Sequence, residues 1–449
     1  MTLEKESLNA LTDALTKLEK GFDHLPAINS NHDVKNMKRV LDQVAEKMQN
    51  NYPYFHPLFA GQMLKPPHPV AKAAYMLSLW INPNNHALDG SKASSPMEKE
   101  VVADLAGMFG WKEHLGHLTG GGTLANLEAL WVADKTHPGK TILASNMSHY
   151  THERICGVLK IDFEKVETDA IGRMDVSFLE TLLKTRDVGT VVCTIGATGT
   201  GSVDPLQEVL ELQKKYGFRI HADAAYGGYF GLTENLAPKT AKNYELLKHV
   251  DSIVIDPHKH GLQPYGCGCI LFQNPEVARH YLHDSPYTYF TSDDLHLGEI
   301  SLECSRAGAS AVALWATHQL LPPVKHGDFS KDLSKSRDAA LDLHARLQSH
   351  SGFYPIMEPE TDIVIWAVKG ERTDQMNDLA QAFFEIAESN QLYLSLYNYP
   401  TSKLPKVAFE VNTEHLTCLR SCLMKPEHTE WMQEIWNKIT WSFERIKEG

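Results

Sequence analysis

The run Ser252-Ile253-Val254-Ile255-Asp256-Pro257-His258-Lys259 decides the fold of this chain. Its β-branched centre is typical of a buried strand, and a lysine follows shortly after that strand ends. Upstream, a second apolar run ends at Asp223, within His221-Ala222-Asp223-Ala224-Ala225-Tyr226-Gly227-Gly228. Two strands that each end in one reactive side chain predict an α/β protein. In such a protein the chemistry gathers at the carboxyl ends of parallel strands.

Lys259 and Asp223 together indicate one kind of cofactor. A lysine at a strand end can form a Schiff base with an aldehyde, and an aspartate at a neighbouring strand end can keep a pyridine nitrogen protonated. These are the two protein groups that pyridoxal 5'-phosphate chemistry needs most. Either residue alone would be interpreted as a surface lysine in a turn or as an aspartate capping a helix. The pair gains weight because a glycine turn and a histidine occur upstream.

The glycine turn Thr119-Gly120-Gly121-Gly122-Thr123 stands directly before an apolar helix predicted at 124–134. Glycines let the backbone approach an anion closely, and a helix start directs its N–H groups and its positive dipole end at that anion. No Gly-Lys-Ser/Thr follows, so the turn is not a Walker loop. A glycine turn at a helix start is common, and its interpretation as a phosphate site depends on Lys259 in the same sheet.

Two further candidates follow strands predicted at 141–145 and 190–195. His149 lies a few residues past the first strand, where an imidazole can lie flat on a pyridine ring and reach a substrate carboxylate. The alternative is a loop histidine with a structural partner. Thr198 lies in a glycine-rich turn after the second strand, where its hydroxyl can donate to a cofactor oxygen or orient Asp223. A purely structural turn fits Thr198 nearly as well.

The composition is that of a globular protein of 449 residues, with 43% hydrophobic and 22% charged residues. A formal net charge of −13, without a basic block, argues against a nucleic-acid partner. Seven cysteines suit free thiols in a reducing compartment, and the spacing Cys267-Gly268-Cys269 is wrong for zinc, so no metal site is predicted. The charged first residues lack a signal-peptide core, and no apolar run is long enough to span a membrane. We therefore expect a cytoplasmic protein.

The pattern divides the chain into three parts. Residues 1–60 form an N-terminal helical arm, whose amphipathic helices at 3–20 and 34–49 either dimerise or pack on their own subunit. Residues 61–322 alternate helices and strands, as a large domain with a mostly parallel sheet requires. Residues 323–449, after Pro322-Pro323, form a smaller α+β domain. Its predicted helices lie at 331–349, 373–389 and 427–446, and its predicted strands at 363–368, 392–397, 406–411 and 416–423.

Taken in order, the motifs resemble the group II pyridoxal-phosphate-dependent amino-acid decarboxylases, which include the aromatic amino acid, tyrosine, histidine and glutamate decarboxylases. The resemblance implies the fold-type I architecture of aspartate aminotransferase, pyridoxal 5'-phosphate as cofactor, and a homodimer with its active sites at the interface. The motifs that carry it are His56-Pro57-Leu58-Phe59, Thr119 to Leu127, His149-Tyr150-Thr151, Gly196 to Gly201, Asp223-Ala224-Ala225 and Asp256-Pro257-His258-Lys259.

The resemblance also implies roles for single residues around the cofactor. Lys259 resembles the lysine that binds the cofactor covalently, and Asp223 resembles the partner of the pyridine nitrogen. His149 resembles the histidine that stacks on the ring, with Ala225 under the opposite face. The predicted phosphate contacts are Gly121, Gly122, Thr123 and His258.

The same resemblance implies roles for residues near the substrate and near the subunit interface. Arg420, in Leu419-Arg420-Ser421-Cys422, falls where the family often grips the substrate carboxylate. Ser305-Arg306 resembles a step that serves the partner subunit's phosphate or braces the interface. The segment 80–86 and the loop 284–299 are the predicted lining of the side-chain pocket.

One departure from the family pattern concerns the proton donor at Cα. Many of these decarboxylases carry a tyrosine on a mobile loop, whereas the corresponding stretch here is Leu295-His296-Leu297-Gly298-Glu299. His296 is the predicted catalytic donor, with Tyr287 or Tyr289 as alternatives.

The implied activity is removal of the α-carboxylate of an aromatic or acidic L-amino acid, which gives an amine and CO₂. Alternatives on the same fold are a carbon–carbon lyase, an aldehyde synthase and an aminotransferase. A protein that only binds has no physical need for an intact Lys259 and Asp223, which argues against a non-catalytic descendant.

Overall fold

Seven strands form the central sheet of the molecule, in the order β1-β7-β6-β5-β4-β2-β3. The computed structural model describes residues 5–28, 32–88, 90–282 and 297–448. The neighbouring strands from β3 to β6 run parallel, and β7 runs antiparallel to both β6 and β1. A mostly parallel sheet is therefore confirmed. Its strands are β1 (Leu115–Thr119), β2 (Thr141–Ser145), β3 (Phe163–Val166), β4 (Val188–Thr194), β5 (Arg219–Asp223), β6 (Ser252–Ile255) and β7 (Gly268–Phe272).

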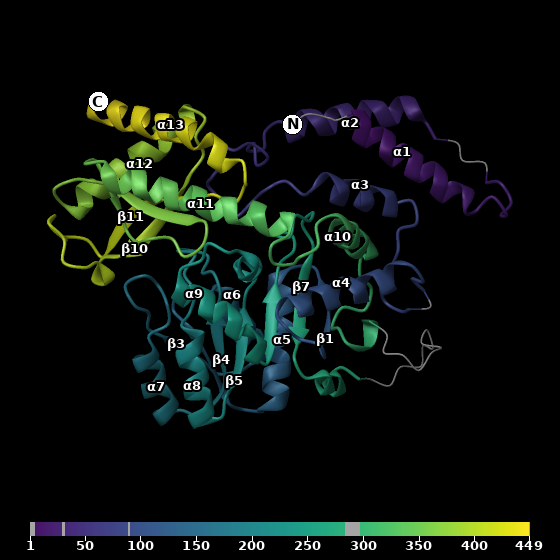
Figure 1. Ribbon diagram of the computed structural model, residues 1–449, viewed down its shortest axis with the longest axis horizontal. Coiled ribbons are helices and arrows are strands. Elements are labelled where there is room, and N and C mark those ends of the chain that lie inside the picture. Colours follow the sequence, from purple (N-terminus) through teal and green to yellow (C-terminus); the bar gives the residue numbers. More distant parts are fainter. Residues whose placement is uncertain (1–4, 29–31, 89, 283–296, 449) are drawn as a thin grey trace.

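Helices surround this sheet and explain the composition of its strands (Figure 1). β4 is buried along its whole length, and parallel strands covered on both faces are near-continuous apolar runs. The helices are α3 (Pro69–Ser78), α4 (Ser94–Met108), α5 (Gly122–Thr136), α6 (Thr151–Leu159), α7 (Val176–Thr185), α8 (Leu206–Tyr216), α9 (Pro238–Glu245) and α10 (Gly308–Leu320). Within the described ranges, no helix has both the length and the apolar character needed to cross a membrane.

The register of the parallel strands brings their reactive ends together. Thr194, the last residue of β4, pairs with Asp223, the last residue of β5. Asp223 also pairs with Val254 of β6, and the turn that carries Lys259 begins just after that strand. Because these strands end at the same edge of the sheet, side chains that are far apart in sequence face one space.

A second, antiparallel sheet has the order β10-β11-β9-β8 and lies apart from the first (Figure 1). Its core contains Trp366 and Phe383, whose ring centroids lie 5.1 Å apart. The proposed boundary at residue 322 falls between α10 and α11 and stays a prediction. The elements of this part are α11 (Asp328–Ser349), β8 (Phe353–Pro355), β9 (Ile363–Val368), α12 (Thr373–Ser389), β10 (Ser395–Pro400), β11 (His415–Cys422) and α13 (His428–Glu448).

One predicted strand of this smaller sheet is wrong and another is displaced. The segment 406–411 forms no strand, and the strand expected at 392–397 is present as β10 but begins three residues later. The segment makes only one isolated bridge, between Arg372 and Glu410. The alternating apolar residues of this segment pack as a loop instead of pairing as a strand. Phe409, for example, contacts Tyr354 with ring centroids 5.5 Å apart.

The N-terminal arm contains the two helices that the apolar pattern predicts, α1 (Lys5–Lys20) and α2 (Val34–Met48). Figure 1 shows them at the edge of the molecule, and α1 packs on α3. No residue of α2 is buried, and its apolar side chains stay open to solvent, as with Met37 at 54% and Leu41 at 57% exposure. A single subunit therefore leaves the apolar stripe of α2 uncovered.

Candidate active site

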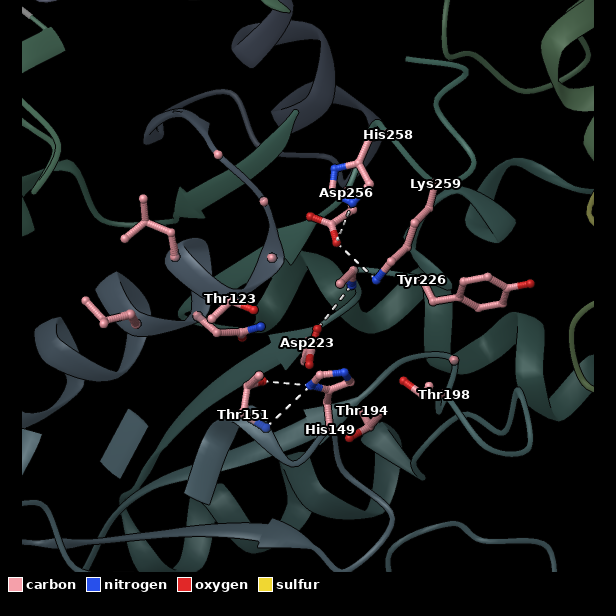
Figure 2. A pocket seen from close by; sticks show the side chains of 18 of the residues that line it. Thr123, His149, Thr151, Thr194, Thr198, Asp223, Tyr226, Asp256, His258 and Lys259 are labelled. Atoms are coloured by element: carbon pink, nitrogen blue, oxygen red, sulfur yellow. Dashed lines mark hydrogen bonds and ion pairs between the residues drawn. The ribbon is translucent and has the colours of Figure 1, made fainter. Parts of the chain in front are cut away.

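A cavity of about 540 Å³ opens at the carboxyl edge of β4, β5 and β6 (Figure 2). Every residue that the sequence predicted for cofactor binding lines this cavity. They are Gly121, Gly122, Thr123, His149, Thr198, Asp223, Ala225, His258 and Lys259. The structure thus brings together residues from the α5 start, the loop before α6 and the ends of three strands.

Lys259 reaches the cavity from the turn after β6. Its Nζ lies 3.0 Å from Oδ2 of Asp256, which is buried and belongs to the same turn. His258 lies on the other side of Asp256, with its Nε2 3.6 Å from Oδ2, while its Nδ1 bonds to the Cys267 carbonyl at 2.8 Å. Burial lowers the pKa of His258. The negative charge of Asp256 raises this pKa but does not cancel the effect of burial. The lysine amine is therefore held at the cavity wall by one carboxylate.

Asp223 lies at the end of β5 and is buried. Its Oδ2 accepts a hydrogen bond from Nε2 of His152 at 2.8 Å, and its Oδ1 accepts one from the Ala225 backbone N–H at 3.2 Å. Burial by itself would raise the pKa of Asp223. The hydrogen bond and charge of His152 and the charge of Lys259 outweigh burial and hold this pKa well below its usual range. Asp223 is thus an anion at the cavity wall.

His149 is oriented by its neighbour at the start of α6. Its Nδ1 lies 2.8 Å from the Thr151 hydroxyl, as Figure 2 shows. Burial lowers the pKa of His149, although the Asp223 charge acts in the opposite direction. A neutral imidazole with one nitrogen engaged can present its ring face to the cavity.

The glycine turn supplies donors next to Asp256 and His258. Gly121 has φ = +146°, a backbone conformation that favours glycine. A Cβ atom on Gly122 would lie 2.7 Å from Oδ2 of Asp256, so this position has no room for a side chain. Gly122 and Thr123 begin α5, where backbone N–H groups have no partner within the helix. These N–H groups can bind an anion.

Three observations fit pyridoxal 5'-phosphate, the cofactor that the resemblance implies. The N–H groups at the start of α5 suit a phosphate. The anionic Asp223 and the amine of Lys259 face the same cavity. Asp256 Oδ1 and Thr194 Oγ1 are buried without a hydrogen-bond partner among the described residues, and both residues line the cavity. Unsatisfied buried polar atoms at a cavity wall are typical of a site that a polar ligand completes.

Arg420 lies just outside the wall of this cavity. Its Nη2 donates to the Thr198 carbonyl at 2.7 Å, and its Nε donates to the Gly199 carbonyl at 3.1 Å. Its Nη1 donates to the Gly61 carbonyl and to the Ser395 hydroxyl, both at 3.3 Å. The guanidinium therefore braces the turn that carries Thr198, and its grip on a substrate carboxylate stays a prediction.

Three other predicted features differ in their outcome. His296, Tyr287 and Tyr289 lie outside the described residues. The segment 80–86 does not line this cavity of a single subunit, and its place in a side-chain pocket built from both subunits stays a prediction. Arg306 is buried and donates to Glu98 at 2.6 Å and to the carbonyls of Leu118 and Asn85, and the roles predicted for Ser305-Arg306 toward a partner subunit stay predictions.

Sequence reasoning missed several residues that shape the site. Thr194 and Tyr226 line the cavity next to predicted residues, and the rule that strand ends carry function could have found both. Asp256 stands in the same motif as Lys259, and only the folded turn shows their contact. His152 had no sequence signal, because its contact with Asp223 depends on how α6 packs against β5.

Comparisons with known proteins point to one family. A family model described as the pyridoxal-dependent decarboxylase conserved domain matches residues 136–369. The chain is similar to the L-tyrosine decarboxylase of Enterococcus faecium, at 26% identity over 76% of this chain and 74% of that protein. It is also similar to the L-aspartate decarboxylase of Thermococcus kodakarensis, at 28% identity over 73% of this chain and 83% of that protein.

Solved structures resemble the fold over nearly its whole length. Oryza sativa TDC with PLP and tryptamine has a TM-score of 0.77 at 15% identity, covering 98% of this chain and 99% of that one. Mouse CSAD in apo form has a TM-score of 0.76 at 17% identity, covering 93% and 91%. At such identities the likeness concerns the fold alone.

Proposed function

This chain belongs to the pyridoxal-dependent decarboxylase family, and we propose that its cavity removes the α-carboxylate of an L-amino acid with an aromatic or acidic side chain. It has the fold-type I architecture and is a carboxy-lyase that uses pyridoxal 5'-phosphate. The observation that carries the proposal is the meeting of Lys259, Asp223 and the α5 start in one cavity. The substrate class is supported by relatives named for tyrosine and for aspartate.

The roles of the chain's own residues follow from their chemistry. When bound, pyridoxal 5'-phosphate supplies an electron-accepting ring that stabilises the charge left at Cα after loss of CO₂. Lys259 is the proposed covalent anchor, because its amine is the one that Asp256 holds at the cavity wall. The N–H groups of Gly122 and Thr123 would hold the phosphate, with His258 at the same end of the site.

The ring is held from its edge and from its faces. The anionic carboxylate of Asp223 would accept a hydrogen bond from the protonated ring nitrogen and would keep that nitrogen positive. His149 would stack on one ring face and Ala225 would pack under the other, while Thr198 would donate to a cofactor oxygen. A neutral His149 suits stacking, since its burial disfavours a second charge beside Lys259.

The substrate carboxylate and the proton at Cα are the least constrained parts. Arg420 is the proposed carboxylate anchor, and it must exchange its bond to the Thr198 carbonyl for the substrate. His296 is the proposed proton donor, with Tyr289 as its rival. Comparing the amine and aldehyde yields of His296→Phe and Tyr289→Phe in air identifies the donor, because without protonation at Cα dissolved O₂ accepts two electrons and the product leaves as aldehyde and ammonia. If both variants make amine at the wild-type rate, neither residue is the donor.

We also propose that the enzyme is a homodimer in the cytoplasm. The apolar stripe of α2 supports a dimer, because a contiguous row of exposed apolar side chains is typical of a protein–protein interface. A second copy is the proposed occupant, and it would add residues to the cavity mouth. All seven cysteines are free, which supports a reducing compartment.

A substrate screen tests the proposed function. The purified protein is loaded with pyridoxal 5'-phosphate and offered each of the twenty amino acids, and CO₂ and amine are measured by mass spectrometry. We expect CO₂ and amine in equal amounts from an aromatic or an acidic amino acid. Aldehyde with ammonia, or a keto acid, would instead indicate an aldehyde synthase or an aminotransferase on the same fold.

A further inference from the structure

A second histidine lies behind Asp223, outside the cavity wall. His152 belongs to the first turn of α6 and has no exposed surface. Its Nε2 lies 2.8 Å from Oδ2 of Asp223. The same helical turn carries Thr151, which orients His149, so the start of α6 supports two of the proposed cofactor contacts.

The direction of this hydrogen bond follows from the chemistry of its partners. An ionised carboxylate only accepts hydrogen bonds, so Nε2 of His152 carries the proton that it donates. The other ring nitrogen, Nδ1, is buried and has no hydrogen-bond partner among the described residues. A buried polar atom without a partner costs free energy. Burying this imidazole therefore costs folding free energy. Among the described residues, the hydrogen bond of its ring goes to Asp223.

That contact opposes the effect of burial on Asp223. Burial would raise the pKa of this carboxyl, and the hydrogen bond from His152 is the largest influence that lowers it. The other titratable groups that act on Asp223 are Lys259 and His221, and Asp223 in turn acts on His149. A carboxylate that is a weaker base takes a shared proton less readily from a nitrogen opposite it.

We propose that His152 is a positioning residue that, by donating to Oδ2 of Asp223, keeps the proton of a bound cofactor on its ring nitrogen rather than on the carboxylate. The inference rests on the proposed function, since it needs a pyridine ring opposite Asp223. It adds a residue to the site from α6, behind the wall of the cavity.

The chain offers a matched control elsewhere in the large sheet. His117 of β1 and Glu128 of α5 form a similar buried pair, with Nε2 of the histidine 2.9 Å from the carboxylate. Glu128 also binds the Tyr281 hydroxyl, and neither His117 nor Glu128 lines the cavity. Substitutions at His117 therefore measure the loss of a buried histidine–carboxylate pair away from the site.

The test compares His152→Gln with His152→Asn in the protein loaded with pyridoxal 5'-phosphate. The amide nitrogen of Gln reaches approximately the position of Nε2, whereas that of Asn reaches only the position of Nδ1. We expect Gln to keep the wild-type absorbance spectrum and its pH titration. We expect Asn to shift that titration and to lower kcat by about 10- to 100-fold with little change in KM. The same pair at His117 should leave the spectrum and kcat unchanged.

Each outcome decides the inference. A His152→Asn variant with the wild-type spectrum and kcat overturns it, and so does a folded His152→Gln variant that is as impaired as Asn. An equal spectral shift in the His117 variants also overturns it, because the effect would then reflect general loosening. If His152→Asn does not fold, His152→Phe, which keeps the ring volume without a donor, carries the same expectation. A wild-type protein that binds no cofactor or forms no amine contradicts the proposed function instead.

Discussion

At the scale of single residues, the position of Lys259 in the cavity should decide which lysine binds the cofactor. Burial lowers the pKa of Lys65 to about 8 and that of Lys425 to about 7, so both are controls for amine reactivity alone. We expect borohydride reduction of the loaded protein to attach the cofactor to Lys259 and not to these lysines. Peptide mass mapping locates the label, and Lys259→Ala should remove it. A label on Lys65 or Lys425 would contradict the proposed anchor.

Asp223 should matter for chemistry far more than for folding. In Asp223→Asn the anion opposite the ring nitrogen is lost, while the side chain keeps its shape beside His152. We expect the rate to fall by on the order of a thousandfold, several kcal/mol in the barrier. Turnover is measured with the substrate found in the screen, and circular dichroism checks the fold. Near-wild-type turnover in a folded variant would show that this aspartate has another role.

His428 should make the protein sensitive to mild acid. It accepts the Lys425 backbone N–H at Nδ1 and donates to the Pro57 carbonyl from Nε2, so the folded protein holds it neutral. Burial lowers its pKa from 6.5 to about 3. The unfolded chain therefore binds the proton first as pH falls, and the folded state loses stability between about pH 6.5 and pH 3.

The size of that loss is testable with one substitution. Between pH 7.5 and pH 5 we expect this histidine to remove about 2 kcal/mol from the free energy of unfolding. The amide of His428→Gln has a donor and an acceptor but does not titrate. Between the two pH values the variant should therefore lose about 2 kcal/mol less unfolding free energy than the wild type. Urea unfolding of the wild type and of the variant at the two pH values measures the loss of unfolding free energy in each protein. Equal losses would mean that His428 does not contribute to the acid sensitivity.

At the scale of elements, the start of α5 should bind phosphate well only while position 122 has no side chain. A Cβ atom in Gly122→Ala would lie 2.7 Å from Asp256 Oδ2, so Asp256 or the turn must move. We expect cofactor binding to weaken by about 10- to 100-fold, the cost of modest overpacking. Equilibrium dialysis of the cofactor measures this change.

Gly107→Ala in α4 is the matched control for that substitution. A Cβ atom there meets nothing within 4 Å, and alanine favours a helix interior over glycine. This variant should bind the cofactor as the wild type does and should be equally or more stable. If Gly122→Ala also binds normally, the turn is not the phosphate site.

At the scale of the whole molecule, the uncovered stripe of α2 should decide the oligomeric state. The double substitution Leu41→Glu with Val44→Glu places two charges on exposed apolar positions, so it should not disturb the fold of one subunit. We expect a dimeric wild type and a monomeric, weakly active variant by light scattering and activity assay. Gln43→Glu, a polar position on the same helix, is the control. A dimeric variant with full activity would place the interface elsewhere.

The sequence by itself determined the strands that end at the cavity, β4, β5 and β6, and the predicted residues that line it. Thr198 and Lys259 follow the ends of β4 and β6 closely, Asp223 is the last residue of β5, and parallel strands bring their carboxyl ends to one edge. The glycine turn before α5 carries its own conformational signal, because few other residues fit there. These features are local in the chain, so they could be predicted without knowing which elements pack together.

Only the tertiary structure decided the contacts that join elements distant in sequence. The strand predicted at 406–411 failed because alternating apolar residues also suit a loop that packs on Tyr354, and a strand exists only where a ladder partner is in place. Arg420 bonds to the carbonyls of the 198–199 turn, which lies far upstream in the chain. His152 meets Asp223 through the packing of α6 on the sheet. Local sequence propensity cannot predict these contacts, because they depend on how the helices and strands pack against one another.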